Sequence, residues 1–352
     1  MDRFNQDTLH FILENAILAP SADNQHRIRF QLVDDTIRVR YTEAELPPQG
    51  GYRRVLALLS LGAVLENLTI AASRFGIGTE TILLPDPTQP NLIMQIRLQD
   101  EQAVVDPLLQ FIPLRHTNRR VFFHGPSMSP EDRTTLARVA SPFSGCHIHW
   151  LDNPELKSQA LKLMRMAEGE RFRNRLLHKE LFSAIHFEVG WQQSCTEGLP
   201  HSALGIERPF RHAFALLRHW PVMRLVNLVG GYRILGWRAV DLPSRLAPHL
   251  GMIAVDQIDD QTVFAAGRAF QRVWLTITQL GLVLQPIPAS AIFSLRGATQ
   301  EGVPGLLQKR LSQGWEDILP MKHPVMLFRV GRATPPTVTT GRNPLKFYTL
   351  GN

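Results

Sequence analysis

The chain has 352 residues, of which 44% are hydrophobic and 20% charged, and its formal net charge is +7. At roughly 150 residues per domain this length predicts two domains, or one domain with large insertions, and the composition excludes a disordered chain and a multi-span membrane protein. Cys146 and Cys195 stand alone without a CxxC pair, which argues against a disulfide framework or a structural zinc site and favours the cytoplasm.

The first half of the chain opens with an amphipathic helix at residues 9–19 and a loop that starts at Pro20. Alternating apolar and polar residues predict strands at 27–33, 36–42 and 91–98. A helix is predicted at 62–78, and because it is apolar over more than one stripe we expect it to be buried on several sides.

The second half repeats this order. A helix capped by Ser129 is predicted at 129–140, a strand at 147–152, a second apolar helix at 267–283 and a strand at 324–331. Gly62 and Gly76 of the first long helix are matched at the same spacing by Gly267 and Gly281 of the second. We therefore predict an α+β fold made of two copies, residues 1–112 and 113–352, joined by their long helices at a pseudo-two-fold interface.

Three candidate segments carry polar chemistry. Arg115, Thr117 and Arg119 alternate, so in an extended segment they share one face and can grip one anionic group such as a phosphate. The alternative for this segment is a solvated basic loop. Residues 20–24 form a turn-like PSADN loop, and residues 340–344 add another arginine, Arg342, in a turn-like setting.

With these motifs the chain resembles the FMN-dependent nitroreductase family. Within that family it resembles the Acg-like branch, in which two nitroreductase modules are fused in one chain. Arg115, Thr117 and Arg119 match the family's Arg-x-Ser-x-Arg phosphate motif, with threonine for serine. Pro20, Ser21 and Asn24 match the start of its flavin loop, Pro-Ser-x-x-Asn-x-Gln-Pro-Trp, but His26, Arg27 and Ile28 replace the last three residues. Arg342 and Pro344 match a late arginine followed by proline. The resemblance implies these cofactor-binding residues: Arg115, His116, Thr117, Arg119, Ser21, Asn24, Gly281, Leu282 and Arg342.

The resemblance also implies the chemistry. The first copy keeps Ser21 and Asn24 but has no phosphate motif, whereas the second has the motif but no asparagine in its loop at Pro142. The two halves together would make one FMN site per chain, in a monomeric pseudo-dimer. FMN would carry hydride from NAD(P)H to a nitroaromatic, quinone or similar acceptor, with no catalytic protein side chain and no metal. Two alternatives are a protein that only sequesters flavin and a membrane- or partner-binding protein on a degenerate flavin fold.

An insertion of about residues 190–250 distinguishes the second copy. Its arginines recur among apolar residues between 208 and 245, which fits a helical lid over the flavin, an interfacial membrane or protein contact, or nucleic-acid binding. We favour the lid and expect no nucleic acid because no recognised module is present. Cys146, His147 and His149 could form a metal site, but alternation in a strand explains this pattern better. Residues 168–175 are expected to form a solvated, salt-bridged helix face.

Overall fold

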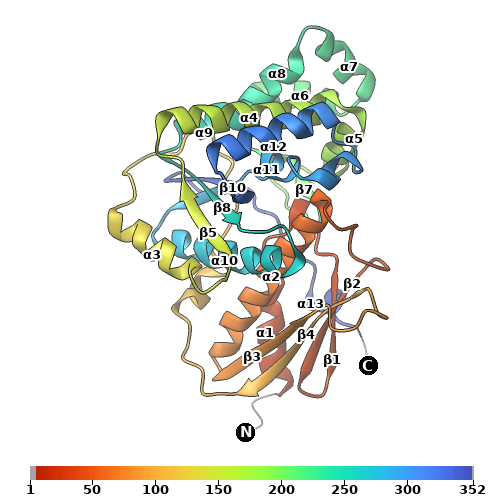
Figure 1. Cartoon of the computed structure of the whole chain (residues 1–352). Helices are drawn as coiled ribbons and strands as arrows, with labels where there is room; N and C mark the ends of the chain where they lie inside the picture. Colours follow the sequence, from red (N-terminus) through yellow and green to blue (C-terminus); the bar gives the residue numbers. More distant parts are fainter. Residues whose placement is uncertain (1–4, 351–352) are drawn as a thin grey trace.

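The computed structural model describes residues 5–350, which fold into two four-stranded antiparallel sheets with helices between and above them (Figure 1). The first sheet has the order β1-β2-β4-β3, with strands β1 (Ile28–Val33), β2 (Thr36–Tyr41), β3 (Ile77–Leu83) and β4 (Leu92–Asp100). The second has the order β5-β8-β10-β9, with strands β5 (Cys146–Trp150), β8 (His249–Val255), β9 (Val283–Pro286) and β10 (His323–Gly331). The α+β prediction is confirmed, and the two sheets share one strand order.

Each half also has a helix before its first strand and a long helix between its second and third long strands. These are α1 (Gln6–Ala16) and α2 (Tyr52–Ser73) in the first half, and α3 (Pro130–Ala140) and α10 (Asp260–Gln279) in the second. The long helices begin well before the predicted residues 62 and 267. They end before Gly76 and Gly281, whose φ angles of 72° and 69° are the left-handed values that stop a helix. The predicted helix ends at 77–78 and 283 therefore belong to strands β3 and β9 instead.

The two long helices cross at their matched glycines. A Cβ atom added to Gly62 would lie 2.2 Å from the carbonyl oxygen of Phe264, and one added to Gly267 would lie 2.3 Å from that of Leu59. Leu59 and Phe264 each lie three residues before one of these glycines, so equivalent positions of the two helices make the two contacts. Only glycine permits so close an approach of the two backbones.

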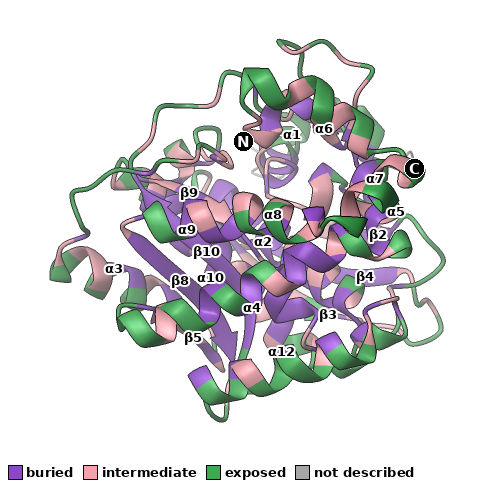
Figure 2. Cartoon of the chain, turned by 90° about the horizontal axis from the view of Figure 1, so that it is seen from above, coloured by how far each residue is buried: buried purple, intermediate pink, exposed green. Residues whose placement is uncertain are grey.

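Two polar pairs join the same two helices. The Gln271 side chain donates a 2.7 Å hydrogen bond to Asn67, and Glu66 forms an ion pair with Arg272 at 2.6 Å. The second pair occupies the positions that match the first. In the described chain α2 is the single helix long and apolar enough to span a membrane, but 78% of its apolar window is buried inside the protein, so we read it as a core helix. Figure 2 shows α10, β8 and β10 mostly in the colour of buried residues.

The second half differs from the first by a long segment between its first two strands. Asp34 and Asp35 alone separate β1 from β2, whereas residues 151–248 separate β5 from β8. That segment holds the two-residue strands β6 (Ile185–His186) and β7 (Leu199–Pro200) and the helices α4 (Pro154–Arg173), α5 (Arg175–Ser183), α6 (Arg211–Leu217), α7 (Trp220–Leu228), α8 (Gly231–Gly236) and α9 (Leu242–Leu246). Together with α11 (Ala289–Ile292) and α12 (Gly305–Ile318) these helices form the layer at the top of Figure 1.

The solvated helix face predicted at 168–175 is wrong. Glu168 and Glu170 of α4 are buried and pair with Arg171 and Arg173, respectively. The reason is that α8 lies directly against this stretch, where a Cβ on Gly236 would come within 2.7 Å of the Gly169 backbone nitrogen. The charges were read correctly as ion pairs, but the sequence did not reveal the helix that covers them.

The C-terminal segment returns to the first half of the chain. After β10 it ends in α13 (Leu345–Tyr348), which packs beside β1, and the Leu350 N–H donates a 2.8 Å hydrogen bond to the Phe30 carbonyl. In Figure 1, α13 accordingly lies beside the first sheet, in the lower part of the molecule. This crossing brings Arg342, from the far end of the sequence, to the loop that follows α1.

Candidate functional site

The loop after α1 forms one wall of the candidate site. Asp23 and Asn24 both have left-handed backbones, with φ of 50° and 58°, which Asp and Asn tolerate better than most residues. Asn24 is buried, and the Ala22 N–H is held by the Ser60 hydroxyl at 3.3 Å. The Ser21 hydroxyl is buried but has no hydrogen-bond partner among the described residues. The loop is therefore a fixed turn with one unused polar group.

Arg342 closes the end of helix α1. Its guanidinium donates to the carbonyls of Ile17 at 2.7 Å and Ala19 at 2.8 Å, and also to the side chain of Asn24. A cation at the C-terminal end of a helix satisfies carbonyls that have no helical partner and interacts favourably with the helix dipole. The arginine thus fixes both the helix end and the loop.

Arg115 lies beside Arg342. It donates a 2.9 Å hydrogen bond to the Leu18 carbonyl, its guanidinium carbon lies 4.4 Å from the centre of the Trp274 ring, and its buried Nε atom has no partner in the described chain. Burial lowers the pKa of Arg115 to about 9, with the nearby Arg342 charge adding to the effect. Burial likewise lowers the pKa of Arg342 to about 10. Both remain cations at neutral pH, and within residues 5–350 neither forms an ion pair with a carboxylate.

Arg119 belongs to a second group of charged side chains, which includes Asp23 of the loop. It donates one long hydrogen bond, 3.3 Å, to the Ala203 carbonyl, and it interacts electrostatically with Asp23 and Arg171. Burial lowers the pKa of Arg119 and raises that of Asp23, although the positive charges of Arg171 and Arg119 oppose the rise at Asp23. The predicted clamp is therefore divided between an Arg115–Arg342 pair and an Arg119–Arg171–Asp23 group.

The residues between the two arginines lie alongside β9. Thr117 forms a parallel bridge with Leu284 beside β9, and the buried Asn118 hydrogen bonds to the Leu284 and Thr334 carbonyls. The Nδ1 atom of His116 lies 2.9 Å from the Leu114 carbonyl, while its Nε2 atom is buried without a partner in the described chain. Arg120, the third arginine of this segment, is exposed and contacts the Pro335 carbonyl, so it lies apart from Arg115 and Arg119.

Gly281 and Leu282 are placed by the end of α10. The Leu282 N–H donates to the Ile277 carbonyl at 3.0 Å, and the Leu282 side chain is buried in the main core. The N–H of Leu282 is thus bonded to the end of the helix, and its side chain belongs to the core. Its contribution to the candidate site is to position the start of β9, against which Thr117 lies.

The three residues that depart from the family loop have structural roles here. His26 is buried and its Nε2 atom lies 3.0 Å from the Ala19 carbonyl, which Arg342 also contacts. Burial, reinforced by the charges of Arg342 and Arg115, lowers the pKa of His26 to about 3. Arg27 is exposed and pairs with Glu43, and Ile28 begins β1 as a core residue.

The first part of the insertion covers the site. The carbonyls of Thr196 and Ala203 accept hydrogen bonds from Asn24 and Arg119, respectively. Ser194 and Cys195 bind the backbone of residues 339 and 341, next to Arg342. We call residues 194–204 the strap. The helices predicted as the lid, α6 to α8, lie instead in the upper layer of Figure 1.

Orphaned polar atoms test whether a polar ligand fits between these walls. The buried side-chain atoms without a partner include Ser21 Oγ, Arg115 Nε, His116 Nε2 and, from the strap, Ser202 Oγ. Buried polar atoms are normally hydrogen bonded, so each such atom calls for an explanation. Three of them belong to residues that the sequence assigns to a cofactor site. The donor set, guanidinium, imidazole and hydroxyl groups with two uncompensated cations, fits an anion.

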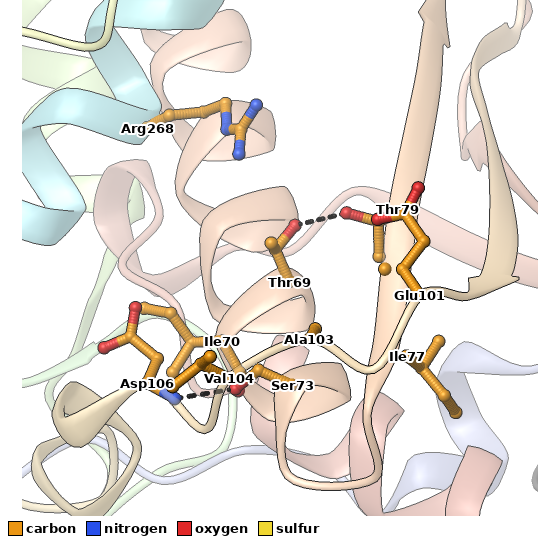
Figure 3. A pocket seen from close by; sticks show the side chains of 11 residues that line it. Thr69, Ile70, Ser73, Ile77, Thr79, Glu101, Ala103, Val104, Asp106 and Arg268 are labelled. Carbon is orange, nitrogen blue, oxygen red and sulfur yellow. Dashed lines mark hydrogen bonds between the residues drawn. The ribbon is translucent and has the colours of Figure 1, made fainter.

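The matching position in the other half looks different. A cavity of about 320 Å³ lies beside Ile77 and Gly78, which match Leu282 and Val283 (Figure 3). Its charged lining side chains are Glu101, Asp106 and Arg268, and Arg268 is already paired with Glu66. A second cavity of about 440 Å³ lies at the loop from Pro142, which matches the loop at Pro20. Two carboxylates and one neutralised arginine are unsuited to a phosphate.

Comparisons with known proteins give structural similarities only. No protein-family model matches the chain, and no curated protein matches it. The FMN-dependent nitroreductase NfnB from Mycobacterium smegmatis, solved with NADPH, has 16% identity and a TM-score of 0.39 over 69% of this chain and 96% of that protein. A nitroreductase with bound FMN from Bacteroides fragilis has 11% identity and a TM-score of 0.37 over 68% and 94%. Iodotyrosine deiodinase with FMN and 3-iodo-L-tyrosine has 13% identity and a TM-score of 0.38 over 67% and 95%. At this strength none of them says what this chain binds.

Sequence reasoning missed several residues at the site. Arg171 of α4 interacts electrostatically with Asp23, but it precedes the insertion expected to cover the flavin, and its stretch was read as a solvated helix face. Asp23 was read only as a turn former, although its position between Ser21 and Asn24 was visible. Arg329 is fully buried and holds the carbonyls of residues 120 and 121, which fixes the end of the Arg115–Arg119 segment. An arginine inside an otherwise apolar strand was the available signal.

Proposed function

We propose that this protein is an FMN-binding oxidoreductase of the nitroreductase type with one flavin site per chain. The observation that carries the proposal is the pair Arg115 and Arg342, two half-buried cations that lie together without a carboxylate partner in the described chain. Buried charge without a counter-charge is costly, and a bound phosphate would supply the missing negative charge. The resemblance of Arg115, Thr117 and Arg119 to a flavin phosphate motif points to the same group.

In this proposal the residues of both halves share the cofactor. Arg115, His116, Thr117, Arg119 and Arg342 would hold the phosphate side, since they carry the donors that suit an anion. Ser21 and Asn24 would contact the flavin edge, with the free Ser21 hydroxyl available for a hydrogen bond. The strap would exclude water from one side. Because the donors come from residues 21–24, 115–119 and 342, neither half could bind the cofactor alone.

FMN, when bound, supplies hydride transfer from NAD(P)H to a nitroaromatic, quinone or similar acceptor. The chain's residues then bind and orient the cofactor, and no protein acid or base is required of them. We further propose that residues 1–112 and 113–352 are two fused modules of the Acg-like type, which make the chain a monomeric pseudo-dimer. The two unpaired cysteines are consistent with a cytoplasmic protein.

A second function is favoured by one observation. The strap already bonds to Asn24 and Arg119, so it could close the site and leave a protein that binds flavin but does not turn over. Anaerobic mixing of the flavin-loaded protein with NADH and with NADPH separates the two functions. Loss of the flavin absorbance would support the oxidoreductase, bound flavin that stays oxidised would support sequestration, and a protein that cannot bind FMN would contradict both.

A further inference from the structure

The second part of the insertion, helices α6 to α8, differs from the strap in the side chains that it exposes. Helices α6 to α8 turn one side toward the protein, where Met223, Phe214 and Leu217 pack on a small apolar cluster with Phe172 and Phe182. These contacts attach the helices to the rest of the protein. The opposite side of the helices has no protein partner in the described chain.

The outward side is strongly apolar. Leu225, Leu228 and Val229 follow one another at helical spacing at the end of α7 and are 65%, 78% and 85% exposed. Further large exposed side chains on the same helices and their connections are Phe210, Leu216, Ile234 and Trp237. Single exposed apolar residues are ordinary, but so many on one small substructure mark an interaction surface. We call residues 208–238 the outer helix surface.

The charge of this surface has one sign. It contains Arg208, Arg211, Arg218, Arg224, Arg233 and Arg238, and no aspartate or glutamate occurs between Glu207 and Asp241. Among the described residues only Arg238 of these six pairs with a carboxylate, that of Glu207. Arg208, Arg224 and Arg233 are exposed. The surface therefore combines exposed leucine, phenylalanine and tryptophan with five cations that lack a carboxylate partner in residues 5–350.

We propose that the outer helix surface docks on an anionic lipid membrane. Short amphipathic helices that carry arginine with exposed Trp, Phe and Leu lie in the plane of a bilayer surface, where the apolar residues enter the acyl boundary and the cations meet lipid headgroups. A second copy of this chain is a poor occupant, because a two-fold contact would bring the arginines of one copy against those of the other. The lipid supplies both the apolar depth and the negative charge that the surface lacks.

Sedimentation of the full chain with sucrose-loaded vesicles tests this. We expect co-sedimentation with vesicles of phosphatidylcholine and phosphatidylglycerol, little with phosphatidylcholine alone, and weaker binding at high salt because the attraction is screened. Leu228→Asp with Val229→Asp should reduce the fraction bound roughly tenfold or more, since charge replaces the inserted apolar groups. The matched control is Leu306→Asp with Met321→Asp, two side chains exposed at 65% and 86% outside this surface, which should bind as the unaltered chain does.

A second variant keeps the test independent of the first. Arg208→Ser with Arg224→Ser and Arg233→Ser removes three exposed cations, and should lower binding to anionic vesicles roughly tenfold or more while leaving thermal unfolding unchanged. Binding that is absent, equal on neutral vesicles, or unaffected by both variants would overturn the proposal. So would self-association of the unaltered chain that Leu228→Asp abolishes, because the surface would then be a contact between copies.

Discussion

The guanidinium of Arg342 donates a hydrogen bond to the side chain of Asn24, although the two residues lie 318 positions apart in the sequence. The contact joins the C-terminal segment to the loop after α1, and the same guanidinium holds the last carbonyls of that helix. The candidate site therefore forms where the C-terminal segment meets the loop after α1. Its residues stabilise the fold in addition to any contact with a ligand.

Arg342→Met should destabilise the protein even without flavin. It removes the charged donor from the Ile17 carbonyl and the Asn24 side-chain oxygen and leaves the Ala19 carbonyl with His26 alone. The loss of such charged hydrogen bonds costs about 2 to 4 kcal/mol. Arg119→Met is the matched comparison, because Arg119 makes a single 3.3 Å hydrogen bond and its removal should cost about 1 kcal/mol or less. Urea unfolding of both variants measures the difference. Equal losses would mean that Arg342 is not the structural arginine of the pair.

Arg115→Ala should weaken FMN binding by about 1.5 to 3 kcal/mol, the scale of one hydrogen bond to a charged group. Titration of FMN with each protein, followed by quenching of flavin fluorescence, gives the affinity. Arg120→Ala serves as the control, since Arg120 lies in the same segment but is exposed and contacts only the Pro335 carbonyl with its side chain. Unchanged affinity in Arg115→Ala would place the phosphate elsewhere.

Gly62→Ala should destabilise the protein by roughly 2 to 4 kcal/mol, because the added methyl group meets the Phe264 carbonyl at the crossing of α2 and α10. Gly267→Ala should have a similar effect, since it makes the symmetry-related contact with Leu59. Gly305→Ala, at the start of α12, has open space around its added Cβ and should change the free energy of unfolding little. Thermal unfolding of the three variants checks this. A harmless Gly62→Ala would contradict the close crossing of the helices.

His26 should make the protein less stable in acid. Its pKa is about 3 in the folded protein, and the ordinary value is 6.5, so between these two pH values the unfolded chain binds more protons. The free energy of unfolding then falls as the pH drops through this window, by at most about 1.4 kcal/mol per pH unit from this group. The nearby charges of Arg342 and Arg115 are positive and act in the same direction as burial.

His26→Gln tests the contribution of that residue, because glutamine can donate to the Ala19 carbonyl but does not titrate. We expect the difference in unfolding free energy between the variant and the unaltered protein to change steadily from about pH 7 to about pH 5 in favour of the variant. A constant difference across this range would show that His26 does not titrate as proposed.

Local pattern was sufficient for much of the fold. Local pattern predicted β1, β2, β4, β5 and β10, and the matched apolar stretches predicted the two long helices, although both helices end before Gly76 and Gly281 rather than at 78 and 283. Strand β8 was missed because HLGMIAV is a continuous apolar run that follows a long insertion, and such a run does not distinguish a buried strand from a helix. The early start of α2 was missed because Arg53 and Arg54 interrupt its apolar pattern.

The candidate site could be predicted only in part, for a similar reason. Arg115, Arg119 and Ser21 were visible as motifs, but the separation of Arg115 from Arg119 depends on Trp274, Leu18 and Ala203, which come from three other segments. The burial of Glu168 depends in the same way on α8. Contacts between segments distant in the sequence leave no periodic signal, and these contacts decide which charges face a ligand.

The stoichiometry of FMN binding tests the central claim most directly. The purified chain is titrated with FMN, and the flavin retained per chain is measured by absorbance after gel filtration. The Arg115 and Arg342 site predicts one FMN per chain, because the matching position in the other half carries Glu101 and Asp106 instead of a pair of cations. A chain that retains no FMN, or that retains two, would contradict this account.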